Sequence, residues 1–365
     1  MDQPDPRRLA LLRPSVYAAA PPERVLLPMV TSTLFPQLPR IHRNPFRVAM
    51  TVMLTGVIVL SVLRLHGPMV TLVALGVPSL FLLYLWQADL LRDIPIWAVV
   101  VAPLLGGVLG VGWVSFTGRL IARSYGISTA AGFVLQALIG VGLAISIGGA
   151  LLMVLPAVVV RVLMGLSGGR PPTSESLDGF SIGVLGALSF TAAATSARLA
   201  PQFVTGVIGK IESRRLLIES VLYGVAVPLT AAAAGGLIGI VLWFRPGKRA
   251  ADHPGVVRAA LMAFTLLVVA IYTAMWVIDA SRLPKWPQLA LHIAITVIAL
   301  LAARFCVQLA LLHEQPDDFA GQPILCVHCD RVVPDMPFCP GCGASARASS
   351  RASRRRRRQS PPRNV

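Results

Sequence analysis

Long apolar segments, separated by short polar connections, make up most of this chain. A helix rises about 1.5 Å per residue, so about 20 apolar residues cross the roughly 30 Å of hydrocarbon in a bilayer. By this rule the pattern predicts eight spans, at approximately Phe46–Leu65, Pro68–Gln87, Ile96–Phe116, Ala131–Leu152, Gly179–Ala197, Leu217–Phe244, Val256–Ile278 and Gln288–Leu312. The fourth apolar run continues through Pro156 to about Leu166, which fits a span followed by a broken or surface-lying helix, or two short spans.

Composition agrees with an all-α polytopic membrane protein. Of the 365 residues, 55% are hydrophobic and 13% charged, against roughly 25% charged in an average soluble domain. We expect four parts: a basic, proline-rich and disordered N-terminal segment over residues 1–45, a transmembrane domain over 46–312, a linker and zinc ribbon over 313–345, and an arginine-rich disordered tail over 346–365.

Charge predicts the orientation of the spans. The chain has 33 basic and 16 acidic residues, a net charge of +17, and much of the positive charge flanks the apolar segments. Connections rich in arginine and lysine stay in the cytoplasm. The N-terminal segment and, after eight spans, the C-terminus are therefore expected on the cytoplasmic side of a bacterial inner membrane. Lys210 and Arg214 fall on the outside in this arrangement and count against it.

Four of the five cysteines form two CxxC pairs near the C-terminus, with nine residues between the pairs. Two such turns can complete a tetrahedral site of four thiolates around one zinc ion. The predicted ligands are Cys326, Cys329, Cys339 and Cys342. His328 is left out because four thiolates already close the site, which should be structural. Gly341 and Gly343 give the second turn backbone freedom. A redox role is the weaker interpretation, because no thioredoxin-like strand–helix context surrounds either pair.

The second cysteine pair, CPGCG, resembles the short zinc ribbons found on bacterial membrane proteins, in which this turn reads CPxCG. That resemblance implies a docking or stabilising module, and we expect another membrane or cytoplasmic protein as its partner.

Beyond the cysteines lies a run of five arginines: Arg354, Arg355, Arg356, Arg357 and Arg358. A solvated tail is one interpretation of this run. Contact with anionic membrane lipids is another, worth about 1 kcal/mol per basic residue near the surface. Nucleic acid is a third, weakened by the lack of aromatic residues that would stack on bases. We predict that these arginines contact lipid or another polyanion.

Ionisable residues within membrane spans are costly and mark functional sites. Few are present: Arg161, Glu219, His292 and Arg304 within spans, and Asp178 and Asp279 at span edges. No pair of them has the spacing of a metal or acid–base site. We therefore assign no catalytic residue.

Three segments resemble PrsW-type intramembrane proteases: Val73–Trp97, Ser176–Leu199 and Pro228–Gly239. The second carries an Asp-Gly, spaced glycines and a phenylalanine where that family has them, namely Asp178, Gly179, Gly183, Gly186 and Phe190. The resemblance implies a PrsW-like membrane domain. Gly and Ala at such positions also allow close helix packing in any polytopic protein.

The resemblance further implies paired glutamates on one span, a glutamate four residues after the phenylalanine, and histidines on later spans, together activating water. Here the first position reads PAVVVRVL (Pro156–Leu163), the second is Ala194, and no histidine lies between Leu217 and Phe244. Without a general base or ligand, no nucleophile is activated. We expect an inactive relative with a binding, scaffold or regulatory role. The alternatives are an active metallo or glutamic peptidase using Asp178, Glu219 and His292, or a transporter.

Overall fold

The protein is an all-α membrane protein with a small C-terminal strand pair. The computed structural model describes residues 43–87, 90–124, 131–166, 175–205, 218–246, 254–280 and 283–314, and in the C-terminal part 322–326, 329, 331–335, 338–343 and 349–359. Eight helices of this described part are long and apolar enough to cross a membrane, which confirms the predicted number. Most of the N-terminal segment expected to be disordered, residues 1–42, lies outside the described residues.

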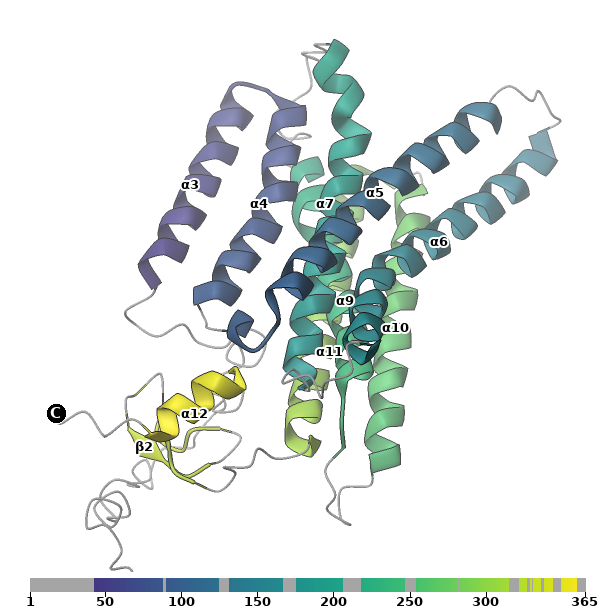
Figure 1. Cartoon of the computed structure of the whole chain (residues 1–365). Helices are drawn as coiled ribbons and strands as arrows, with labels where there is room; N and C mark the ends of the chain where they lie inside the picture. Colours follow the sequence, from purple (N-terminus) through teal and green to yellow (C-terminus); the bar gives the residue numbers. More distant parts are fainter. Residues whose placement is uncertain are drawn as a thin grey trace, which may run out of the picture.

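The helices run antiparallel to their neighbours in sequence, as Figure 1 shows. The membrane helices are α3 (Arg43–Val62), α4 (His66–Gln87), α5 (Ile96–Ser124), α6 (Ala131–Leu166), α7 (Ser176–Thr205), α9 (Val227–Trp243), α10 (Pro254–Ala280) and α11 (Lys285–His313). A 3-10 turn, η3 (Leu90–Arg92), precedes α5, and a π-helix, η4 (Leu222–Ala226), opens the span that α9 completes.

Helix α6 differs from both arrangements expected for the fourth span. It is one continuous helix of 36 residues with Pro156 inside it, and it begins at Ala131, where the fourth span was expected to begin. Membrane helices tolerate proline where neighbouring helices compensate for the lost hydrogen bond. Here α7 leaves room for the ring, since a Cβ added at Gly186 would lie 2.8 Å from Pro156 Cβ.

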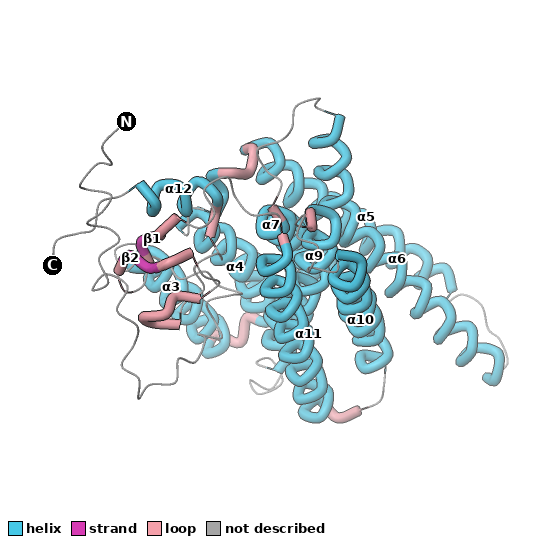
Figure 2. The backbone as a smooth tube through the Cα atoms, turned by 90° about the horizontal axis from the view of Figure 1, so that it is seen from below, coloured by secondary structure: helices cyan, strands magenta, loops and turns pink. Residues whose placement is uncertain are grey.

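Two helices form the centre of the bundle. In the apolar stretch of α7, 72% of the residues are buried, and in the span Ile218–Trp243, which α9 completes, 67% are buried. In the apolar stretch of α3 no residue is buried. Figure 2 shows α7 and α9 among the other helices. Large apolar side chains such as Leu104 and Val108 point outwards, with 63% and 70% exposure, as expected for a lipid-facing surface.

Glycines bring the backbone of α7 into contact with its neighbours. A Cβ added at Gly183 would lie 2.0 Å from the Gly235 carbonyl oxygen of α9. A Cβ added at Gly106 of α5 would lie 2.3 Å from the Gly186 carbonyl oxygen of α7. Gly239 and Gly179 face each other in the same way. Small residues at these positions allow the close approach that stabilises helix pairs in lipid.

The C-terminal part lies at the end of the bundle where α7 begins (Figure 1). Strands β1 (Ile324–Leu325) and β2 (Val332–Val333) pair antiparallel, with Ile324 opposite Val333. A final helix, α12 (Arg351–Gln359), follows. Over these nine residues the structure differs from the predicted disordered tail, because carboxylates from three other segments hold α12. Residues 346–348 and 360–365 of the tail lie outside the described part.

The close contact between α7 and α9 leads to a stability prediction. Gly183→Ala would place a methyl group against the Gly235 carbonyl and should reduce the free energy of unfolding by about 1–3 kcal/mol, the usual cost of overpacking. Thermal unfolding in detergent measures this change. Gly112→Ala on α5 is the control, because open space surrounds that position. Equal melting temperatures for the two variants would contradict the backbone contact.

Candidate functional site

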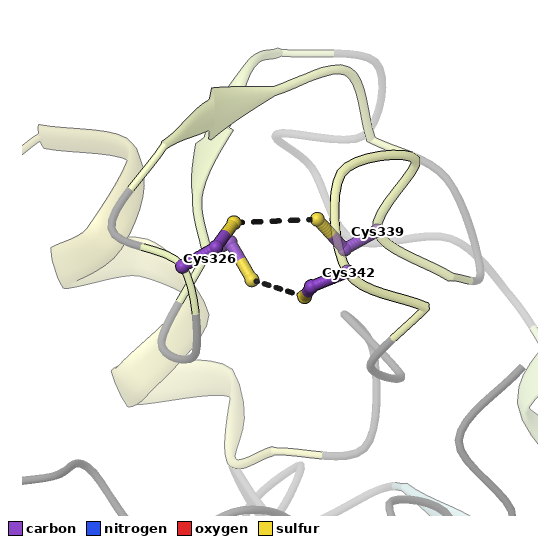
Figure 3. Close-up of side chains that lie close together, drawn as sticks. Cys326, Cys339 and Cys342 are labelled. Carbon is purple, nitrogen blue, oxygen red and sulfur yellow. Dashed lines mark hydrogen bonds between the residues drawn. The ribbon is translucent and has the colours of Figure 1, made fainter. Parts of the chain in front are cut away.

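The four predicted cysteine ligands converge on one point. Their sulfur atoms all lie within 4.8 Å of one another. The Cys326 and Cys342 sulfurs are 3.7 Å apart, as are those of Cys329 and Cys339. Four sulfurs at 2.3 Å from a tetrahedral ion would be separated by roughly 3.8 Å. The cluster therefore has the dimensions of a site for a single metal ion, and Figure 3 shows the labelled cysteines around its centre.

The local backbone explains this convergence. Strands β1 and β2 place Cys326 at the end of a hairpin, where its N–H donates to the Arg331 carbonyl at 2.8 Å. In the second turn the Gly343 N–H donates to the Cys339 carbonyl at 2.8 Å. Gly343 has a φ of 72°, in the left-handed region that glycine adopts without strain. Of the two glycines expected to help, Gly343 is the one with positive φ.

Hydrogen bonding and burial favour the protonated form of the clustered thiols. Hydrogen bonding to Cys326 raises the pKa of Cys329 and raises the pKa of Cys339 to about 12, with burial adding to both. Thiolates bind metal and thiols do not, so an ion would displace the protons that the sulfurs share. With four sulfur ligands no coordination position remains for a reacting water, which fits a structural site.

Helix α12 contacts the cysteine module through two arginines. Arg357 donates to the carbonyl of Leu325, the residue before Cys326, at 3.2 Å. Arg358 pairs with Asp335 at 3.0 Å, and both side chains are almost fully buried. Burial lowers the pKa of Arg357 to about 10, with a further contribution from Arg354. These contacts fix α12 to the hairpin.

The opposite side of α12 contacts the membrane domain. Arg354 forms an ion pair with Glu175, directly before α7, and both side chains are buried. Arg351 donates to the same carboxylate at 3.0 Å. The Ala352 N–H donates to Asp93, just before α5, at 3.0 Å. Helix α12 therefore connects the cysteine module to the starts of two membrane helices.

The carboxylates around the start of α7 form a group that we term the acidic nest, made of Asp93, Glu175, Asp178 and Glu314. Glu314, just after α11, accepts hydrogen bonds from the Ser176 N–H and hydroxyl at 2.8 and 3.0 Å. Asp178 lies in the first turn of α7, where the helix dipole favours negative charge. The nest thus combines acidic groups from three chain segments that are distant in sequence.

Burial raises the pKa of Glu314 to about 8, and the nearby Glu175 carboxylate adds to this effect. At neutral pH the Glu314 side chain is therefore mainly protonated. Its carboxyl oxygen Oε1 still accepts the two hydrogen bonds from Ser176. A neutral Glu314 reduces the repulsion among the acidic groups.

A second polar cluster lies at the other end of the bundle. His292 on α11 is fully buried, and its Nε2 lies 3.2 Å from an Asp279 carboxylate oxygen. Gln288 donates to the same carboxylate at 2.9 Å. The hydroxyls of Thr230 and Thr296 lie 3.0 Å apart and join α9 to α11 beside the π-helix. Hydrogen bonds of this kind hold membrane helices together.

The three candidates for an alternative peptidase site do not meet. Asp178 interacts electrostatically with Glu314, at the end of α11. His292 lies 22 residues earlier on that helix, a separation of about 33 Å at 1.5 Å per residue. Glu219 belongs to the end with Asp279, since both act on Tyr223. A water molecule activated at one end of the bundle is out of reach of the other.

The five arginines predicted to contact polyanions are in different environments. Arg354 is buried, Arg357 and Arg358 direct their side chains against the hairpin, and Arg355 and Arg356 are exposed. The acids that bind Arg354 and Arg358, namely Glu175 and Asp335, were not predicted as their partners. The available signal was that the chain has few acids and that two of them, Glu175 at a span edge and Asp335 between the two cysteine pairs, lie close to the ends of predicted elements.

The raised pKa of Glu314 predicts a pH-dependent stability. In the unfolded chain this group titrates near 4.5, whereas in the fold it holds its proton to about pH 8. The folded state binds more protons in this window, so stability falls as pH rises from about 4.5 to 8. Glu314→Gln keeps the acceptor for Ser176 without the charge and should flatten this fall in thermal melts.

Glu314→Ala is the control, because it loses the acceptor and should melt lower at every pH. Parallel melting curves for the wild type and Glu314→Gln across this pH window would contradict the assignment.

No family model matches this chain, and neither a curated protein nor a solved structure is significantly similar to it.

Proposed function

We propose that this protein is a non-catalytic member of the PrsW-like group that binds another protein through a zinc ribbon at the cytoplasmic face of a bacterial inner membrane. The observation that carries the proposal is the attachment of the cysteine module to the membrane helices by the buried Arg354–Glu175 pair. A ribbon held in this way has a fixed orientation relative to the bilayer, which suits a binding platform.

The polar groups of the described membrane helices support a non-catalytic role. Asp178 and His292 lie at opposite ends of the bundle, and Ala194 stands where the resemblance expects a glutamate. Ala194 is 9% exposed, and its backbone nitrogen lies 3.2 Å from the position that a Cβ on Gly110 would occupy. Hydrolysis in a membrane needs a base and a water at one place, and the described helices pack closely at this position.

Zinc is the ion that best fits the cysteine cluster. Four thiolates in tetrahedral spacing favour zinc or an iron–sulfur centre over hard cations such as magnesium. A reducing compartment keeps such thiols available, which supports a cytoplasmic location for the ribbon. With eight antiparallel spans, the start of α3 lies at the same end as the ribbon (Figure 1).

The proposed metal site predicts one zinc ion per chain. Purified full-length protein should contain one equivalent by elemental analysis, and the variant with all four cysteines changed to serine should contain none. Single changes at Cys306, the buried cysteine outside the cluster, should leave the zinc content unchanged. Zinc that persists in the four-serine variant would refute the site.

The binding role predicts which variants lose function. Crosslinking in native membranes should join the ribbon of the wild type to a defined protein, and the four-serine variant should lose this product. The variant with Asp178, Glu219 and His292 all changed to alanine should keep it, provided that it still inserts. If the triple variant alone abolishes a cellular phenotype, the active peptidase is the better interpretation.

A further inference from the structure

Helix α12 does not have the composition of a stable isolated helix. Six of its nine residues are arginines, and no acidic residue lies in its first turn. Like charges three and four residues apart destabilise a helix, and helices shorter than about 12 residues are marginal in water. Its N-terminus is capped by Ser350, whose hydroxyl accepts from the Ser353 N–H at 3.2 Å. The remaining stabilisation comes from the carboxylates it contacts.

Two contacts of α12 depend on the cysteine module. Arg358 pairs with Asp335, and Arg357 donates to the Leu325 carbonyl. The fold of the hairpin positions both of these acceptors. The buried cluster of that hairpin consists of four residues, Ile324, Cys326, Val333 and Cys339, two of which are metal ligands. So small a core does not fold by itself, and metal binding supplies the folding free energy in domains of this kind.

Three further contacts of α12 lie in the acidic nest. There the buried Glu175 carboxylate binds both Arg351 and Arg354 through the same oxygen. The side chain of Glu175 is 8% exposed, so losing Arg354 would leave a buried charge without its strongest partner. Removing one partner of a buried ion pair is strongly destabilising, because it leaves the other charge uncompensated. The buried carboxylate of Glu175 is therefore most stable when an arginine side chain pairs with it.

We propose that the acidic nest is an arginine-binding site for a protein segment, which α12 occupies in cis while the ribbon holds zinc, and which opens to an arginine-bearing segment of a partner protein when zinc is lost. This inference rests on the zinc ribbon of the proposed function. Zinc occupancy at the ribbon would then control access to the start of α7 through Arg357 and Arg358.

The vacant nest can be tested with a peptide supplied in trans. Arg354→Glu in the full-length, zinc-loaded protein should repel α12 from Glu175 and vacate the nest. A fluorescent peptide with the sequence SSRASRRRRRQ, residues 349–359, should then bind, as measured by fluorescence polarisation. Arg356→Glu is the matched control, since Arg356 is exposed and points about 200° away from Arg354 around the helix. That variant should stay closed and bind the peptide roughly tenfold more weakly or not at all.

Glu175→Gln combined with Arg354→Glu removes the central carboxylate and should abolish peptide binding. Equal binding to the Arg354→Glu and Arg356→Glu variants, or binding that survives the loss of Glu175, overturns the arginine site.

Zinc control is tested by amide hydrogen exchange in the wild-type chain. Removing zinc with a chelator should speed exchange over residues 351–359 by roughly tenfold or more, to the rate seen in zinc-loaded Arg354→Glu. If zinc leaves and these amides stay protected, the control by zinc is overturned although the metal site stands. If the purified chain binds no zinc, the proposed function fails instead, and the peptide experiment still decides the arginine site.

Discussion

The structure depends on the backbone contact of α7 with α5 and α9. Gly179 and Gly183 of α7 allow carbonyl oxygens of α9 to approach where any other residue would place a side chain. Gly106 and Gly110 of α5 admit carbonyl oxygens of α7 in the same way. In lipid, where apolar surface gives no preference for helix association, such close packing supplies much of the attraction. It fixes α7 in the centre of the bundle. The first turn of α7 is consequently fixed too, and with it the position of Glu175 and Asp178 relative to Asp93 and Glu314.

The acidic groups gather at this turn for an electrostatic reason. The free N–H groups at the start of a helix attract negative charge, and here Glu314 reaches Ser176 from 138 residues away. Carboxylates that crowd in this way repel each other, so a neutral Glu314 and a paired Arg354 reduce the cost. A buried ion pair adds little net stability compared with apolar packing, but it strongly disfavours misplaced partners. The pair with Glu175 therefore determines where α12 lies more than how stable the protein is.

Local sequence patterns predicted the membrane helices and the cysteine cluster. They did not predict the contacts between segments that are distant in sequence. Hydropathy alone gave the eight spans, because lipid requires long apolar helices. Cysteine spacing gave the cluster, because two short turns suffice to position four sulfurs. The course of α6 through Pro156 was missed, since the room for its ring is made by Gly186 on another helix. Helix α12 was missed because its sequence favours repulsion, and the compensating Glu175 is 179 residues away from Arg354.

The motif residues that resemble a protease have a second explanation in this fold. Gly179, Gly183 and Gly186 are required by the helix contacts, and Asp178 by the start of α7, whether or not the chain descends from an enzyme. At Ala194 a small residue is favoured because α5 passes close to α7 there. The spacing of these glycines therefore follows from helix packing, and the acidic nest and the cysteine module are polar features at the end of the bundle where α7 begins.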